Sequence, residues 1–124
     1  MVDVIRFRTQ KLSAQVAHGG VGEILAHRAA SVESGLNAHF IDCVVIPPGK
    51  SIGVHTHRTD NEEVYVILKG RGRMTIGTTE RGVESGDVIV NPPGGTHGLH
   101  NDGSEAIELI VIEYGVPAGD QRSE

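Results

Sequence analysis

Apolar and polar residues alternate along most of this chain, and no segment sustains the 3.6-residue repeat of an amphipathic helix. Such alternation is typical of β-strands, in which successive side chains point to opposite faces of a sheet. The pattern therefore predicts an all-β protein. The expected strands are Val2–Phe7, Glu23–Ala29, Asn37–Ile46, Ile52–His57, Glu63–Lys69, Arg71–Ile76, Asp87–Val90, His97–Asn101 and Ala106–Tyr114.

Clusters of glycine, proline, asparagine and aspartate separate the expected strands and indicate tight turns. They are Pro47–Gly49, Lys69–Gly72, Ser85–Asp87, Pro92–Gly95 and Asn101–Gly103. Composition agrees, because 17 of the 124 residues are glycine and short strands joined by tight turns need many glycines. Strands this short favour an antiparallel sandwich or barrel, and a chain of this length suits one compact domain.

The net charge of −5 argues against a nucleic-acid partner. The basic segment Lys69–Arg73 is expected on a solvated strand face. No stretch approaches the roughly 18 consecutive apolar residues of a membrane span, and Met1–Arg8 holds no signal-peptide core. Cys43 is the single cysteine, so it forms no internal disulfide and is expected to be a small buried filler. We expect a cytoplasmic protein without nucleic-acid or membrane partners.

The candidate chemistry lies among the seven histidines. His55 and His57 stand at i and i+2 of an expected strand, so both rings should project from one face. A carboxylate at the head of the next strand, from Glu62 or Glu63, and His97 just after a rigid Pro/Gly turn can complete a site with them. Imidazole and carboxylate groups are common ligands of divalent metal ions.

These residues resemble the two sequence motifs of the cupin family. The second motif, G-x5-P-x-G-x2-H-x3-N, is matched in full by Gly86, Pro92, Gly94, His97 and Asn101. The first, G-x5-H-x-H-x3-4-E-x6-G, is matched at Gly49, His55, His57 and Gly70. The resemblance covers about residues 37–113 and implies a cupin-type antiparallel β-barrel, or double-stranded jelly roll. We expect residues 37–115 to form the barrel core, residues 1–36 to pack on it as strands and loops, and residues 116–124 to be a flexible tail.

The first motif leaves the glutamate ambiguous. Glu62 has the motif's spacing from His57, whereas Glu63 has its spacing to Gly70. We favour Glu63, because a loop accommodates an inserted residue more easily than a strand accommodates a slip that would turn every side chain to the other face. Glu62 would then point outward. The resemblance thus implies one divalent metal ion, Fe, Mn, Ni, Cu or Zn, held by His55, His57, Glu63 and His97.

Two further residues have two interpretations each. Tyr65 shares a strand face with Glu63 and is a candidate catalytic proton donor or substrate contact; alternatively, it is a core aromatic with its hydroxyl at the edge. Arg73 is either a site for a substrate carboxylate or phosphate, or a solvated strand residue.

The remaining histidines are weaker candidates. His100 is expected to face away from His97, and His39 either lines the barrel or faces solvent. His18 and His27 are expected on the surface. The neighbouring Gly19–Gly22 segment is interpreted as a flexible loop, because no expected strand and helix flank it as a phosphate-binding loop requires.

Cupins carry out many unrelated reactions, so the expected fold does not decide the function. An octahedral metal ion with these ligands would keep open positions for substrate, water or dioxygen, as in a catalytic site. We expect a metal-dependent enzyme acting on a small polar substrate, with oxygenase-type oxidation slightly favoured over isomerisation or epimerisation. The alternative is a barrel that binds or senses a small ligand. The chain also resembles stand-alone bacterial cupins that pair as homodimers, here with Val2–Phe7 adding to the partner's sheet edge.

Overall fold

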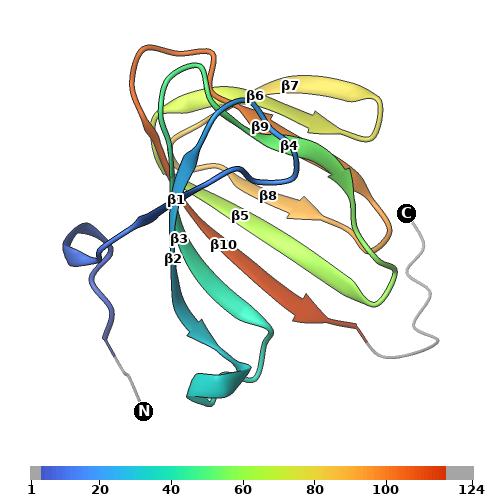
Figure 1. Cartoon of the computed structure of the whole chain (residues 1–124). Coiled ribbons are helices and arrows are strands. Elements are labelled where there is room, and N and C mark those ends of the chain that lie inside the picture. The colour runs from blue at the N-terminus through green and yellow to red at the C-terminus, as the bar shows by residue number, and fades with distance from the viewer. Residues whose placement is uncertain (1–3, 117–124) are drawn as a thin grey trace.

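The computed structural model describes residues 4–116, which form two antiparallel β-sheets facing each other (Figure 1). One sheet has six strands in the order β1-β2-β3-β10-β5-β8, and the other has four in the order β4-β9-β6-β7. The strands are β1 (Ser13–Gln15), β2 (Ile24–Ser31), β3 (Phe40–Ile46), β4 (Ser51–Thr56), β5 (Asn61–Lys69), β6 (Arg71–Ile76), β7 (Thr79–Glu84), β8 (Val88–Asn91), β9 (Thr96–His100) and β10 (Ile107–Gly115). This arrangement confirms the expected all-β jelly roll.

The predicted absence of α-helices holds for residues 4–116, where the helical elements are two 3-10 turns, η1 (Phe7–Thr9) and η2 (Val32–Ser34). No helix in that part of the chain is long and apolar enough to cross a membrane.

The core lies between the two sheets and follows the period-2 pattern of the sequence. On β10, Ile107, Leu109 and Val111 are buried, and the residues between them are partly exposed. Met74 of β6 and Leu99 of β9 are buried in the same core from the four-stranded sheet. Cys43 on β3 is also buried, as expected for a small filler.

Asn101, the last residue of the second motif, has a structural role. Its side chain is fully buried, and its Nδ2 donates hydrogen bonds to the carbonyl oxygens of Ile46 and Glu105, each at 2.8 Å. Its Oδ1 accepts a hydrogen bond from the Gly103 amide at 2.9 Å. The amide group therefore fastens the loop between β9 and β10 to the end of β3.

The prediction of a strand at Val2–Phe7 is wrong for the residues that the structure describes. Residues 4–6 belong to no strand and Phe7 begins η1. Ile5 and Phe7 instead line a hollow with Ile41 and Ile110, on the outer side of the six-stranded sheet. Their alternation with charged residues reflects this packing and not strand pairing. The expected flexible tail lies outside the described residues from position 117 onward.

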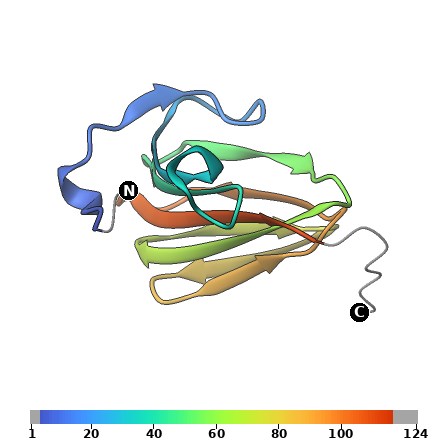
Figure 2. The same cartoon turned by 90° about the horizontal axis from the view of Figure 1, so that it is seen from below.

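The segment after β1 joins the two sheets. β1 pairs with β2 at one end of the six-stranded sheet, and the following residues lie against β4, the edge strand of the other sheet. The Ala17 carbonyl accepts a hydrogen bond from the Gly53 amide at 3.0 Å, and the Val21 carbonyl accepts one from the Ser51 amide at 3.0 Å. Figure 2 shows this N-terminal segment running along the outside of the sheets.

Candidate metal centre

Three imidazoles and one carboxylate converge between the sheets. His55 lies on β4, His57 follows that strand, Glu63 lies on β5 and His97 on β9. One ligand atom from each of these residues lies within 4.8 Å of the others. Glu63 Oε1 is 3.1 Å from His97 Nε2 and 3.2 Å from His57 Nε2, and the Nε2 atoms of His55 and His57 are 3.1 Å apart. The structure thus brings together all four residues that the sequence singled out, and the cluster could hold a metal ion.

An irregularity in β4 turns His55 toward the cluster. Ile52 pairs with Leu99 and His55 pairs with His97, so β4 has one residue more than β9 between these two pairs. An extra residue of this kind is a β-bulge, which changes the face on which the following side chains lie. Ile52 is buried in the core, Val54 is exposed, and His55 faces the cluster. Without the bulge, Ile52 and His55 would face opposite sides of the sheet.

Hydrogen bonds donated by Nδ1 orient two of the three rings. His55 Nδ1 donates to the Gly53 carbonyl at 2.7 Å, and His57 Nδ1 donates to Asn61 Oδ1 at 2.8 Å. Metal-binding histidines commonly donate the other ring N–H in this way, which leaves Nε2 for the metal. Gly53 and Asn61 were not predicted as partners, although Asn61 lies directly before the two glutamates.

The protonation states of the cluster suit a cation. Burial is the main cause that lowers the pKa of His55, to about 4, and the neighbouring imidazoles lower it further. Burial opposes ionisation of Glu63, but the hydrogen bond with His97 and the nearby histidines keep its pKa below the ordinary value. A neutral imidazole and an ionised carboxylate are the forms in which these groups bind metals.

The two adjacent glutamates point in different directions. Glu63 faces the cluster, whereas Glu62 accepts a hydrogen bond from the Tyr114 hydroxyl. Glu62 is therefore turned away from the cluster, as expected, but it is buried, with 4% of its surface exposed.

Tyr65 lies directly beside the cluster. Its ring is fully buried and meets the His97 ring edge-on, with centroids 5.5 Å apart. Burial raises the pKa of Tyr65, and the adjacent Glu63 charge and a hydrogen bond to Glu63 raise it further. The phenol is therefore protonated and donates to the Glu63 carboxylate. Tyr65 is therefore a core aromatic whose hydroxyl reaches a site residue, and its role as a catalytic proton donor or substrate contact stays a prediction.

A small pocket of about 150 Å³ opens beside the cluster. Glu63, Tyr65 and His18 belong to its wall, together with apolar side chains such as Ile52. Arg28 and Asp42 also line it.

Arg28 and Asp42 form a bidentate ion pair, with N–O distances of 2.9 and 3.1 Å. The Arg28 guanidinium lies 4.0 Å from the centre of the Phe40 ring. The charges of this pair cancel, so Glu63 provides the unbalanced charge of the pocket wall.

His18 was expected on the surface, and it is exposed. The sequence did not indicate that its ring stacks on His55, with centroids 3.5 Å apart and planes inclined by 8°. A contact between residues this far apart in the sequence leaves no periodic signal in a single chain.

The other candidates lie outside the cluster. His39 is exposed and its Nδ1 is 2.8 Å from Glu113 Oε2. His100 is exposed on β9, facing away from His97 as expected. His27 is partly exposed, and Arg73 is exposed, 3.9 Å from Glu80.

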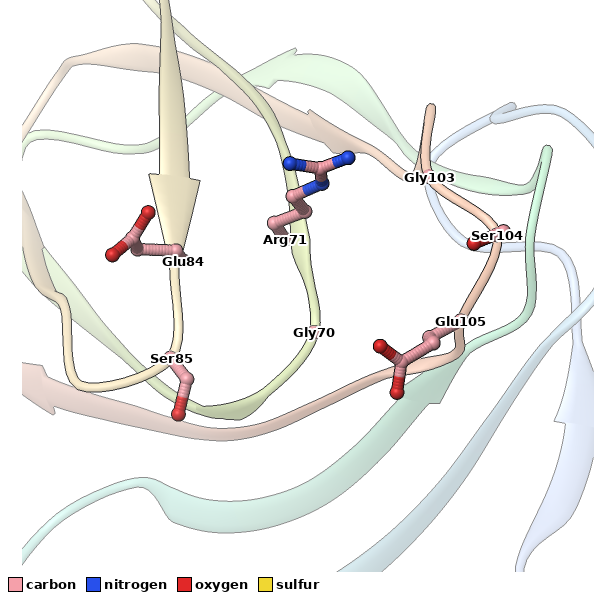
Figure 3. Close-up of a pocket in the computed structure, with 7 residues that line it drawn as sticks. All are labelled: Gly70, Arg71, Glu84, Ser85, Gly103, Ser104 and Glu105. Atoms are coloured by element: carbon pink, nitrogen blue, oxygen red, sulfur yellow. The ribbon is translucent and has the colours of Figure 1, made fainter.

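A larger hollow lies at the opposite end of β5 from Glu63 (Figure 3). It is lined by Gly70, Arg71, Glu84, Ser85, Gly103, Ser104 and Glu105. Arg71 is the cation of this wall, beside two carboxylates. Within the part of the chain that the structure describes, the residues of this hollow form no group that could hold a metal ion. The centre at His55 is therefore the stronger candidate.

Known proteins resemble this chain in sequence and in fold. A family model described as "Cupin domain" matches residues 43–113. An oxalate-binding protein of Thermotoga maritima is 30% identical over 95 residues, which cover 76% of this chain and 78% of that protein. An uncharacterised protein of Methanocaldococcus jannaschii is 36% identical over 70 residues, but the match spans only 55% of that protein and 56% of this chain.

Among solved structures, a crystal structure from Thermotoga maritima described as a "predicted oxalate decarboxylase" superposes with a TM-score of 0.86. The sequence identity is 26%, and the superposition covers 92% of this chain and 100% of the other. These similarities agree with the jelly-roll topology derived above.

Proposed function

Because this chain belongs to the cupin family, we propose that it is a metal-dependent enzyme that binds and transforms a small carboxylate, of about the size of oxalate. The observation that carries the proposal is the convergence of the four ligand atoms within 4.8 Å beside a pocket of about 150 Å³. His55, His57, Glu63 and His97 are the proposed ligands, and one divalent ion is the proposed cofactor.

The donor set fits such an ion. Three imidazole nitrogens and one carboxylate oxygen suit Fe, Mn, Ni, Cu or Zn, and four protein ligands leave positions open on an octahedral ion. When bound, the ion would supply Lewis acidity and, if it is redox-active, electron transfer. The chain's own residues would orient the ligands, through the hydrogen bonds from His55 to Gly53 and from His57 to Asn61.

The size and charge of the pocket support a small anionic substrate. A volume of about 150 Å³ corresponds to roughly five water molecules at about 30 Å³ each. The Arg28–Asp42 pair is neutral as a unit, so a divalent ion would outweigh the single charge of Glu63 and attract an anion. The name of the Thermotoga maritima relative, an oxalate-binding protein, agrees with this class of ligand.

Oxygenase-type oxidation remains slightly favoured over isomerisation as the proposed reaction, because the open positions suit a co-substrate as well as a substrate. Tyr65 would keep its proton on Oη and donate a hydrogen bond to Glu63, which fixes the carboxylate in place. A barrel that only binds or senses a small ligand is the second candidate, and the name of the same relative supports it.

Elemental mass spectrometry of the purified protein tests the cofactor. We expect about one equivalent of a divalent metal in the wild type, and its loss in a variant carrying both His55→Ala and His97→Ala, because two of four ligands are removed. A redox metal would favour oxidation and zinc would favour isomerisation. Absence of metal after purification and after reconstitution would contradict the proposal.

Incubation of the metal-loaded protein with oxalate then separates the two candidate functions. Consumption of oxalate, followed by mass spectrometry of the products, is expected of an enzyme. Saturable binding without consumption would instead favour the binding barrel.

A further inference from the structure

His18 lines the pocket and lies outside both sequence motifs and outside the matched segment 43–113. One face of its ring is stacked on His55. Its two nitrogens lie on the ring edge, and neither makes a hydrogen bond to another group of residues 4–116. The ring is thus held through its face while its polar edge stays available.

The backbone at His18 is held in a conformation that side chains rarely adopt. Its φ is 51°, and it is the one residue other than glycine with positive φ in the described part of the chain. Such a conformation costs about 1 kcal/mol or more and persists only where the surrounding structure enforces it.

The enforcing contact is with β4. A Cβ atom on Gly53 would lie 2.1 Å from the carbonyl oxygen of His18, so the turn reaches its place only because residue 53 is glycine. The Gly20 and Gly53 amides both donate to the Ala17 carbonyl at 3.0 Å. The turn that carries His18 is therefore fixed on the strand that carries His55.

Apart from Gln15, the other polar residues of the pocket wall already have partners. The Tyr65 hydroxyl donates to Glu63, and the Arg28 guanidinium is engaged by Asp42. His18 is placed on the same wall as Glu63 with an uncommitted N–H. Carboxylate oxygens are strong acceptors for such a donor.

We propose that His18 is a specificity-determining residue, whose ring-edge N–H donates a hydrogen bond to a carboxylate oxygen of the ligand in the pocket. This inference rests on the proposed function, because it concerns the ligand of the same centre. It predicts that His18 contributes to ligand affinity and not to metal affinity.

The test uses protein reconstituted with Mn(II), freed of excess metal, and titrated with oxalate by calorimetry. His18→Phe keeps a flat ring of similar size that can stack on His55 but carries no N–H. His18→Asn keeps an N–H donor, and asparagine tolerates positive φ. His100→Ala is the matched control, because it removes an exposed histidine that lies outside the pocket.

We expect His18→Phe to retain about one equivalent of metal and to weaken oxalate binding about tenfold, the usual effect of losing one hydrogen bond to a charged group. His18→Asn should bind oxalate more tightly than His18→Phe, and His100→Ala should equal the wild type. Wild-type affinity in His18→Phe, or loss of its metal, would overturn the role of His18 and leave the proposed function intact. If the wild type itself takes up no metal or binds no oxalate, the proposed function fails and this inference fails with it.

Discussion

At the scale of single residues, two neighbouring carboxylates on β5 have separate roles because a strand turns successive side chains to opposite faces. Glu63 contacts His57 and His97, whereas Glu62 accepts a hydrogen bond from the Tyr114 hydroxyl. Both are buried, so burial alone does not distinguish them. The direction of each side chain decides which one can act as a metal ligand.

Substituting the two glutamates one at a time tests this distinction. Glu63→Gln removes the negative charge next to three imidazoles, so we expect metal affinity to fall by more than about 100-fold, beyond the usual effect of losing a residue that only orients a ligand. Glu62 is turned away from the cluster, so Glu62→Gln should leave metal affinity at the wild-type value. The amide still accepts a hydrogen bond from Tyr114 but has lost the charge that strengthens it, so stability should fall by about 1 kcal/mol. Metal titration and thermal unfolding measure both effects, and equal metal loss in the two variants would contradict the assignment of Glu63.

The main residues of the site could be predicted from the sequence, because both motifs place them at fixed distances from turn residues. The fixed spacing along a strand to Gly70 favoured Glu63 over Glu62 as the ligand. The hydrogen-bond partners of the His55 and His57 rings and the position of His18 could not be predicted. The contact of His18 with His55 depends on how a loop lies across a strand, which the order of apolar and polar residues does not encode.

At the scale of elements, most strands could be predicted because each has a buried face that alternates with an exposed one. β7 was missed since only Val83 is buried along it, and β1 was missed since all three of its residues are exposed. Edge strands with polar faces lack the alternation on which the prediction rests. The bulge in β4 was also missed, because one extra residue changes pairing without changing composition.

The contact between the His18 turn and β4 makes a prediction for Gly53→Ala. The new methyl group would meet the His18 carbonyl, which is backbone and cannot rotate away. We expect a loss of about 1–3 kcal/mol in the free energy of unfolding, as for other overpacked positions, and displacement of the His18 turn.

Gly82→Ala on β7 is the matched control, because its nearest neighbour would be the Arg73 side chain at 3.8 Å, an ordinary contact. Chemical denaturation compares the two variants. Equal stability of both would argue against a tight fit between the turn and β4.

At the scale of the whole molecule, the outer side of the six-stranded sheet presents apolar side chains to solvent. Leu68 is 43% exposed, Val88 62% and Val90 56%, and the two valines lie on β8, the edge strand. We propose that a second copy of the chain covers this strip, as the expected homodimer requires. The expected contribution of Val2–Phe7 has no support in the described residues, since residues 4–7 are not in a strand.

Light scattering coupled to size exclusion tests the dimer. We expect a mass of about twice the 13.2 kDa of one chain for the wild type, and a single-chain mass when Val88 and Val90 are both replaced by lysine, because charge opposes burial of the strip. Val32→Lys changes another exposed valine, the first residue of η2, and should leave the dimer intact. A wild type that elutes with the mass of one chain would contradict this arrangement.

If His18 meets the ligand as proposed, the metal site and the ligand contact come from two different segments of the chain, and this has an evolutionary consequence. The four residues of the proposed metal site lie within the segment that matches the family, at residues 43–113, whereas His18 comes from the preceding segment. Mutations in that segment can change the pocket wall beside the proposed ligand while the four proposed metal-binding residues stay the same. Related barrels could therefore diverge in substrate through a change of this one turn, and retain the same proposed metal ligands.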